Sequence, residues 1–186
     1  MFELVFFVEG RSEKVMLEAF LPTILPPHIS PRCVPFEGKN DLLRRLPTKL
    51  RAWQNPQSKF IILRDQDSGD CLKIKEKILN ICRNENKNDA VVRIACRELE
   101  SWSLGDLVAV EEGLQISGLV RHQNKKKFRN PDTLDNAAQE LGKLTNQKYQ
   151  KVSGSRAIGP HLNVKRNRSH SFRVFVEGVM RIVNSA

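Results

Sequence analysis

The sequence has few cysteines and no long hydrophobic run. Its four cysteines form no CxxC pair and have no histidines at zinc-site spacing, which argues against a zinc centre and favours reduced, buried thiols. The apolar N-terminal segment covers only residues 2–8, far short of the roughly 20 residues of a transmembrane helix, and no basic leader precedes it. We therefore expect a cytoplasmic protein with no membrane partner.

Positive charge is present in excess and is unevenly distributed. The 186 residues carry 31 Lys and Arg against 21 Asp and Glu, a formal net charge of +10. Residues 1–120 hold 17 basic and 17 acidic side chains, whereas residues 121–186 hold 14 and 4. The whole excess lies in the last third of the chain, which predicts a polyanionic partner such as a nucleic acid.

Short runs of β-branched and aromatic residues alternate with segments of helical periodicity. The runs predict buried strands at residues 2–8, 33–36, 59–63 and 90–96. The segments between and after them predict helices at residues 12–21, 40–53, 71–82 and 97–104. Ser12, Asp70 and Asp106 are predicted helix N-caps. This alternation predicts an α/β fold with a mostly parallel sheet covered by helices on both faces.

The alternating pattern weakens from residue 113 onward. Two further helices are predicted at residues 133–144 and 172–183, with a basic run and a Gly/Ser/Arg-rich segment around them. We expect an α/β domain over residues 1–112 and a basic, partly helical C-terminal extension over residues 113–186 that packs on it.

Acidic residues follow three of the predicted strands. Glu9 follows the first, Asp65 and Asp67 follow the 59–63 run, and Glu98 and Glu100 follow the last. Because ligands of open α/β sheets gather at the carboxyl ends of the strands, and Mg²⁺ prefers carboxylate and phosphate oxygens, these residues are candidate metal ligands. Asp65 and Asp67 should point the same way if their turn is extended. Glu13 joins them if the chain turns tightly at Gly10. Any one of these acids alone would be interpreted as a solvent-exposed residue of a turn or helix cap.

The order of these motifs resembles a known domain. The sequence strand-Glu9-Gly10-x-x-Glu13, strand-Asp65-x-Asp67, strand-Cys96-Arg97-Glu98 is similar to the Toprim domain of topoisomerases, bacterial primases and OLD (overcoming lysogenization defect) nucleases, over roughly residues 1 to 110. The ExxxE spacing looks most like the OLD branch, whose third motif is SxE. Cys96 replaces that serine, so the metal ligand of the third motif can be either Glu98 or Glu100. Residues 93–102 and 167–172 also look like a small bacterial family of stand-alone Toprim-like proteins of uncharacterised function.

The resemblance implies a divalent-metal-dependent nuclease that hydrolyses DNA, or else RNA. Glu9, Asp65 and Asp67 would hold one Mg²⁺ or Mn²⁺, and Glu13 with Glu98 or Glu100 a second. The chain has no GxxxxGK(S/T) loop, so a role in phage defence or repair that needs ATP would require a separate ATPase subunit. The alternative is a non-catalytic, nucleic-acid-binding or regulatory subunit of an ATPase complex. A topoisomerase is disfavoured, because the only tyrosine, Tyr149, has a polar setting.

Basic residues of the C-terminal third are candidate nucleic-acid contacts. They are Lys151, Arg156, Lys165, Arg166 and Arg168, in a setting rich in Gly, Ser and Asn. OLD-type enzymes use a lysine at the metal site, and the resemblance implies that role for Lys151, Arg156 or Lys165 without choosing among them. His161 and His170 are interpreted as surface residues.

Overall fold

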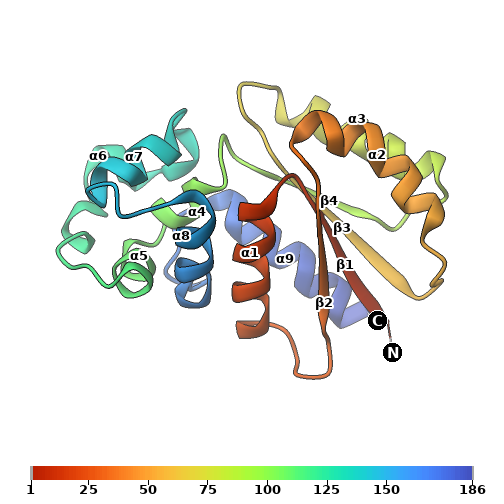
Figure 1. Ribbon diagram of the computed structural model, residues 1–186, viewed down its shortest axis with the longest axis horizontal. Helices are drawn as coiled ribbons and strands as arrows, with labels where there is room; N and C mark the ends of the chain where they lie inside the picture. The colour runs from red at the N-terminus through yellow and green to blue at the C-terminus, as the bar shows by residue number, and fades with distance from the viewer. Residues whose placement is uncertain (1, 186) are drawn as a thin grey trace.

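Four parallel strands form the centre of the protein in a computed structural model, which describes residues 2–185 (Figure 1). They are β1 (Glu3–Val8), β2 (Pro31–Pro35), β3 (Ser58–Asp65) and β4 (Val91–Ala95), in the spatial order β2-β1-β3-β4. Every neighbouring pair is parallel, with Val8 opposite both Pro35 and Leu63, and Asp65 opposite Ala95. The predicted α/β class with a parallel sheet is confirmed, and the carboxyl ends of all four strands lie along one edge of it.

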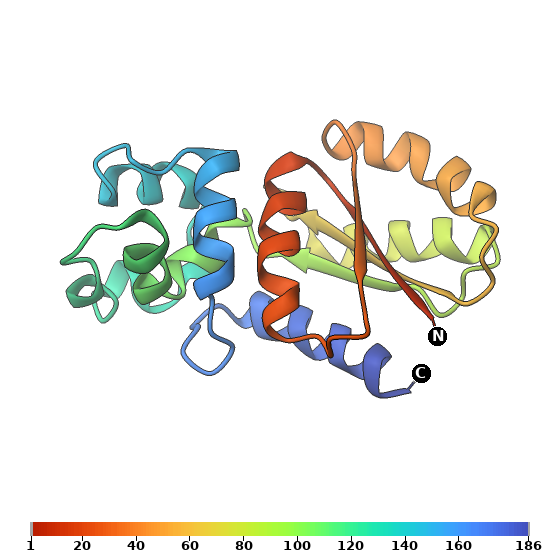
Figure 2. The same ribbon diagram turned by 60° about the horizontal axis from the view of Figure 1, so that its bottom comes forward.

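Helices cover both faces of the sheet (Figures 1 and 2). On one face, Val5, Phe7, Phe60 and Ile62 share a core with α2 (Lys39–Ala52) and α3 (Cys71–Asn84). On the other face, the alternate residues of β1 and β3 pack with α1 (Arg11–Phe20) and α9 (His170–Ser185). The side-chain alternation of the strands therefore decides which helical layer each strand residue faces.

A helical part lies beside the sheet, between β4 and α9 in the chain (Figure 1). Its helices are α4 (Glu100–Leu104), α5 (Leu107–Leu114), α6 (Lys126–Arg129), α7 (Ala137–Leu144) and α8 (Lys151–Ile158). Single 3₁₀ turns occur at Leu21–Thr23, Val120–His122, Pro131–Thr133 and Gly159–His161.

The helical part and the sheet share one hydrophobic core. Residues of α4, α5, α7 and α8 belong to the same buried cluster as β1, α1 and α9. The backbones of α1 and of the helical part approach each other closely at Gly159, where an added Cβ would lie 2.9 Å from the carbonyl oxygen of Met16. The domain boundary expected at residue 112 falls inside α5, and α9 returns to the sheet as one of its covering helices.

Two of the three predicted N-caps are confirmed. Asp70 Oδ1 accepts hydrogen bonds from the backbone N–H groups of Leu72 (2.9 Å) and Lys73 (3.2 Å), and Asp106 Oδ1 accepts one from Ala109 (3.2 Å). The prediction for Ser12 is wrong. Helix α1 begins at Arg11 with Gly10 as its cap residue, so Ser12 is inside the helix and donates to Glu13 instead.

Within residues 2–185, none of the helices has the length and apolar character needed to cross a bilayer. The four cysteines are free thiols: Cys33 and Cys82 are buried, whereas Cys71 and Cys96 are partly exposed.

Candidate functional site

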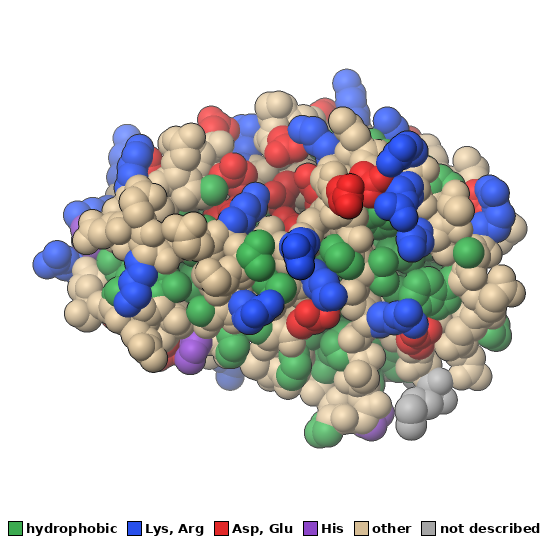
Figure 3. Space-filling model, in the orientation of Figure 1, with side chains coloured by type: hydrophobic (Ala, Val, Ile, Leu, Met, Phe, Trp, Pro, Cys, Tyr) green, Lys and Arg blue, Asp and Glu red, His purple; other side chains and the backbone are tan. Residues whose placement is uncertain are grey.

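Acidic side chains gather at the carboxyl edge of the sheet. Glu9 directly follows β1, Asp65 is the last residue of β3, and Glu100 begins α4 shortly after β4. Glu13 reaches the same place from the first turn of α1. Figure 3 shows Asp and Glu side chains in a hollow above the start of α1, with Lys and Arg side chains around it. We call Glu9, Glu13, Asp65 and Glu100 the acidic edge.

Asp65, Glu13 and Glu100 are the buried members of the acidic edge. Their exposed fractions are 6%, 3% and 0%. Burial raises the pKa of Asp65 well above its ordinary value, and the negative charges of Glu13, Glu100 and Glu9 raise it further. Since Asp65 has the same side-chain parity as Ile61 and Leu63, it faces the α1 side of the sheet, where Glu13 lies.

Glu9 lies on the other side of the strand ends, next to two cations. Its Oε2 lies 3.6 Å from Nε of Arg64, and Arg64 also lies 4.0 Å from Asp67. Lys39 Nζ donates to Asp67 Oδ2 at 2.8 Å. Burial raises the pKa of Glu9, as do the charges of Asp67 and Glu13, whereas Arg64 opposes them. The acidic constellation is therefore divided by the sheet into two adjoining groups.

Asp65 and Asp67 do not point the same way, because the extended turn that this required is not formed. Asp67 has φ 54°, a left-handed conformation that Asp tolerates better than most residues. The turn is fixed by the Asp67 N–H, which donates to the carbonyl of Arg97 at 2.8 Å. Alternation of side chains holds only in extended backbone, so Asp67 turns toward Lys39 while Asp65 turns toward Glu13.

The tight turn at Gly10 brings Glu13 to the acidic edge. Gly10 has an extended conformation, and a Cβ added to it would lie 3.0 Å from Oε2 of Glu13. A larger residue at this position would therefore crowd the Glu13 carboxylate. The condition under which Glu13 joins the cluster is met by the structure.

Glu98 and Glu100, the two candidate ligands that follow β4, have different surroundings. Glu98 Oε2 accepts a hydrogen bond from the backbone N–H of Ala138 at the start of α7, at 2.8 Å. Glu100 is fully buried, and its Oε1 accepts a hydrogen bond from the Tyr149 hydroxyl at 3.0 Å. Burial raises the pKa of Glu100, whereas the positive charge of Lys151 opposes the rise. The geometry thus brings Glu100 to Asp65 and uses Glu98 as a helix cap.

Of the basic residues predicted in the C-terminal third, Lys151 reaches the acidic edge. Its Nζ lies 3.9 Å from Oε1 of Glu100, and 56% of its side chain is exposed. Burial acts to lower the pKa of Lys151, but the charges of Glu100, Asp65, Glu13 and Glu98 raise it above its ordinary value. Lys151 lies here because α8, which it begins, packs along α1. Arg156 and Lys165 are exposed, and no ion pair joins either to an acid within residues 2–185.

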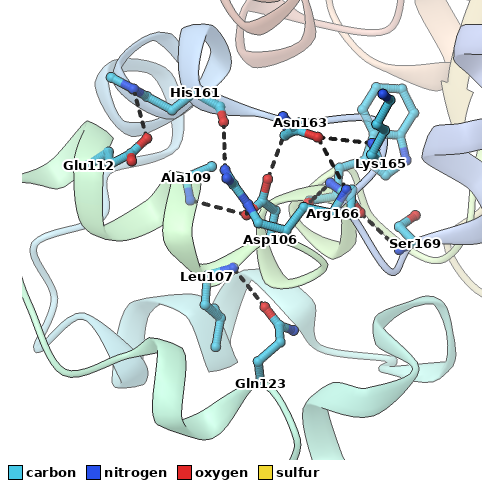
Figure 4. A network of polar contacts seen from close by, with 12 residues as sticks. Asp106, Leu107, Ala109, Glu112, Gln123, His161, Asn163, Lys165, Arg166 and Ser169 are labelled. Atoms are coloured by element: carbon cyan, nitrogen blue, oxygen red, sulfur yellow. Dashed lines mark hydrogen bonds and ion pairs between the residues drawn. The ribbon is translucent and has the colours of Figure 1, made fainter.

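Two of the five predicted nucleic-acid contacts, Arg166 and Arg168, hydrogen-bond to other parts of the chain. Arg166 Nε donates to buried Asp106 at 2.6 Å and its Nη2 donates to the carbonyl of His161 at 3.1 Å (Figure 4). Arg168 donates to the Gln123 carbonyl (2.8 Å) and to Asn124 Oδ1 (2.6 Å). His161 is exposed and pairs with Glu112 at 3.2 Å. These contacts hold the loop before α9 against α5.

The two segments that carry the second resemblance, residues 93–102 and 167–172, pack against each other. Trp102 Nε1 donates to Ser171 Oγ at 3.0 Å, and Asn167 Nδ2 donates to the Trp102 carbonyl at 2.8 Å. The Cys96 N–H also donates to Ser171 Oγ, at 3.2 Å. Both segments therefore have a structural role, which is to fix the turn between β4 and α4 that places Glu100.

Three residues at the site do not follow from the motif order: Arg64, Lys39 and Tyr149. Arg64 was detectable as a charge next to the apolar run at residues 59–63, and it is 8% exposed. Lys39 and Tyr149 come from distant segments. Burial raises the pKa of Tyr149 strongly, and the charge of Glu100 adds to the rise. Tyr149 therefore acts as a neutral hydrogen-bond donor to Glu100.

The donor chemistry of the acidic edge fits a hard cation. Buried oxygens of three of its members, Glu9 Oε2, Asp65 Oδ1 and Glu100 Oε2, have no hydrogen-bond partner in the part of the chain that the structure describes. Buried charges ordinarily pair with an opposite charge or a metal. Over the same residues, no three His, Cys, Asp or Glu side chains are already drawn together in the arrangement of an ion site. The carboxylates lie near one another but are not closed around a common point.

The raised carboxyl pKa values predict how stability changes with pH when metal is removed. A carboxyl whose pKa is raised by folding contributes stability below its unfolded pKa, and loses it as pH rises through its folded pKa. The gain in unfolding free energy from Asp65→Asn should therefore grow as the pH rises from the ordinary pKa of an aspartate, 3.8, toward the raised pKa of the folded protein. Urea unfolding of both proteins in EDTA measures this difference. A gain that stays constant over that interval would contradict it.

Fold and site together define an α/β protein with a buried acidic edge and a neighbouring lysine. The chain belongs to the family described as a domain of unknown function (DUF4276), whose model matches residues 8–180. No curated protein and no solved structure gives a significant match to the chain. The matched region runs from the end of β1 into α9, so it includes both the acidic edge and the helical part.

Proposed function

We propose that this protein is a Toprim-type, divalent-metal-dependent nuclease that hydrolyses phosphodiester bonds. The observation that carries the proposal is the set of buried carboxylate oxygens of Glu9, Asp65 and Glu100 that accept no hydrogen bond, with Lys151 next to Glu100. Glu13 is the fourth member of the acidic edge, and it lies close enough to raise the pKa of both Glu9 and Asp65.

Asp65, Glu13 and Glu100 would hold one Mg²⁺ or Mn²⁺, and Glu9 would share it or hold a second ion with Asp67. Such ions, when bound, stabilise the charge of an attacking water and of a leaving oxygen. Asp67 would have to leave Lys39 to take part, since the two side chains are now paired at 2.8 Å.

The other residues at the edge position the carboxylates and the phosphate. Lys151, a partly exposed cation, would bind the phosphate and stabilise the negative charge that develops on it during hydrolysis. The Tyr149 hydroxyl donates to Glu100 and keeps its carboxylate oriented, and Ser155 lies 3.1 Å from the same hydroxyl. Arg64 balances part of the charge of Glu9.

A nucleic acid is the substrate that the charge distribution favours. Lys and Arg side chains surround the acidic hollow in Figure 3, and the last third of the chain carries the entire net charge of +10. Phosphate backbones bind such surfaces through release of counterions. With no GxxxxGK(S/T) loop in the chain, we assign any ATP-driven step to a separate subunit, in phage defence or repair.

A second candidate function is a nucleic-acid-binding or regulatory subunit without turnover. The pairing of Asp67 with Lys39, and of Glu9 with Arg64, favours it because cations of the chain already neutralise part of the acidic constellation. The unpartnered oxygens of Asp65 and Glu100 oppose it, since a site without metal would gain stability by losing those buried charges.

The purified protein, incubated with plasmid DNA and with RNA, separates the two. In Mn²⁺ or Mg²⁺ we expect cleavage that EDTA stops. Binding without cleavage in either metal, also after addition of an ATPase partner if its gene is adjacent, would instead support the subunit.

A further inference from the structure

A pocket opens beside the acidic edge, between α7 and the beginning of α8. Its volume is about 380 Å³, within the range of roughly 300 to 1,000 Å³ that small-molecule sites occupy. Its walls include Glu100, Gln139, Gly142, Gln147, Tyr149 and Lys151.

The pocket adjoins the acidic edge at Glu100 and Lys151. Glu100 belongs to the acidic edge and to the pocket wall, and Lys151, which lines the pocket, has its ammonium group 3.9 Å from the Glu100 carboxylate. A phosphate bound by Lys151 would therefore place the nucleotide attached to it at the mouth of this pocket. The base of that nucleotide could then enter the pocket while its phosphate stays bound to Lys151.

The lining combines apolar surface with amide edges. Ala138, Gly142 and the Tyr149 side chain supply the apolar part. Gln139 and Gln147 are exposed, and neither side-chain amide makes a hydrogen bond to the described residues 2–185. An amide offers one acceptor and two donors, which are the groups that pair with the edge of a nucleobase.

The backbone around the pocket brings Gln147 to its wall. Asn146 and Gln147 both have left-handed conformations, with φ 49° and 63°. Gly142 leaves room for the Gln147 amide, since a Cβ there would lie 3.2 Å from Gln147 Oε1. The Gln147 N–H donates to the Gly142 carbonyl at 2.7 Å, which fixes this turn against the end of α7.

We propose that this pocket receives an unstacked nucleobase next to the scissile phosphate, so that the substrate is a single-stranded or locally unpaired nucleic acid. This inference rests on the proposed nuclease function. A base inside a duplex is stacked and paired, and it enters a protein pocket only after it is flipped out at a cost of a few kcal/mol. The pocket thus favours strands whose bases are already free.

The test compares cleavage of one oligonucleotide as a single strand and as a blunt duplex, in Mn²⁺. Wild type is expected to cleave the single strand at least about tenfold faster. Gln139→Ala/Gln147→Ala should raise KM for the single strand about tenfold, because it removes two hydrogen-bonding groups. Ala138→Trp, which fills the pocket, should abolish the preference. The matched control is Gln57→Ala. Gln57 is exposed and directly precedes β3, so it lies at the opposite end of the strands from the acidic edge.

The outcomes separate the pocket from the proposed function. Cleavage of both substrates at equal rates, unchanged by the pocket variants, would overturn the pocket inference and leave the nuclease proposal standing. Absence of all cleavage would overturn the nuclease proposal. Fluorescence anisotropy with the same two oligonucleotides then decides the pocket: tighter single-strand binding that the pocket variants lose supports it, and equal binding by wild type and pocket variants overturns it.

Discussion

Asp65→Asn is expected to lower metal-dependent cleavage by at least about a thousandfold while leaving the protein folded. Asp65 is the residue on which the other acids of the edge converge, since Glu13, Glu100 and Glu9 all act on its pKa. Asparagine preserves its shape and removes one buried negative charge, so the fold should become more stable without metal. The measurements are the initial rate of oligonucleotide cleavage in Mn²⁺ and the urea midpoint of the same preparation.

Asp70→Asn is the matched control for this variant. Asp70 lies five residues later and caps α3 through backbone N–H groups, a role that asparagine performs about as well. Its rate should stay within about twofold of wild type. Asp67→Asn should have an intermediate effect, because Asp67 is paired with Lys39 next to the acidic edge and is not one of its buried members. Cleavage by Asp65→Asn at the wild-type rate would contradict the assignment of Asp65.

Lys151→Met is expected to lower kcat by roughly 10² to 10³, with a smaller change in KM. The reason is that a cation beside the reacting phosphate stabilises charge that increases in the transition state, whereas a distant cation only attracts the strand. Lys151→Arg should restore part of kcat, since it restores the charge with altered geometry.

Lys148→Met is the matched control for Lys151. Lys148 is exposed and donates to the backbone carbonyl of Gln115, away from the acidic edge, so its loss removes the same charge from the surface. It should raise KM modestly and spare kcat. Equal loss of kcat in the two variants would mean that only net charge matters, and it would remove Lys151 from the site.

The fold class was predictable because strands and helices have local signals. Buried strands of four to eight residues alternate with amphipathic segments, and this alternation is sufficient to predict a parallel sheet. The position of Glu9 and Asp65 followed from it, since strand ends of a parallel sheet share one edge. The position of Glu13 at the same edge also depended on how the chain turns at Gly10.

The rest of the site depends on contacts that no local pattern encodes. The direction of Asp67 is set by its hydrogen bond to Arg97, which lies on the next strand's loop. Lys151 and Tyr149 reach Glu100 only because α8 packs on α1, and the choice among three basic residues required that packing. The composition around Arg166 and Arg168 predicted phosphate contacts. In the folded chain, Arg166 donates a hydrogen bond to Asp106 and Arg168 donates one to the carbonyl of Gln123.

Isothermal titration calorimetry of Mn²⁺ into wild type and into Asp65→Asn, without nucleic acid, most directly tests the claim that the acidic edge is a metal centre. Wild type should bind one or two ions, and Asp65→Asn should lose at least one of them. Two results would contradict the claim. One is equal binding of Mn²⁺ by both proteins. The other is that neither protein binds Mn²⁺, whether or not an oligonucleotide is present.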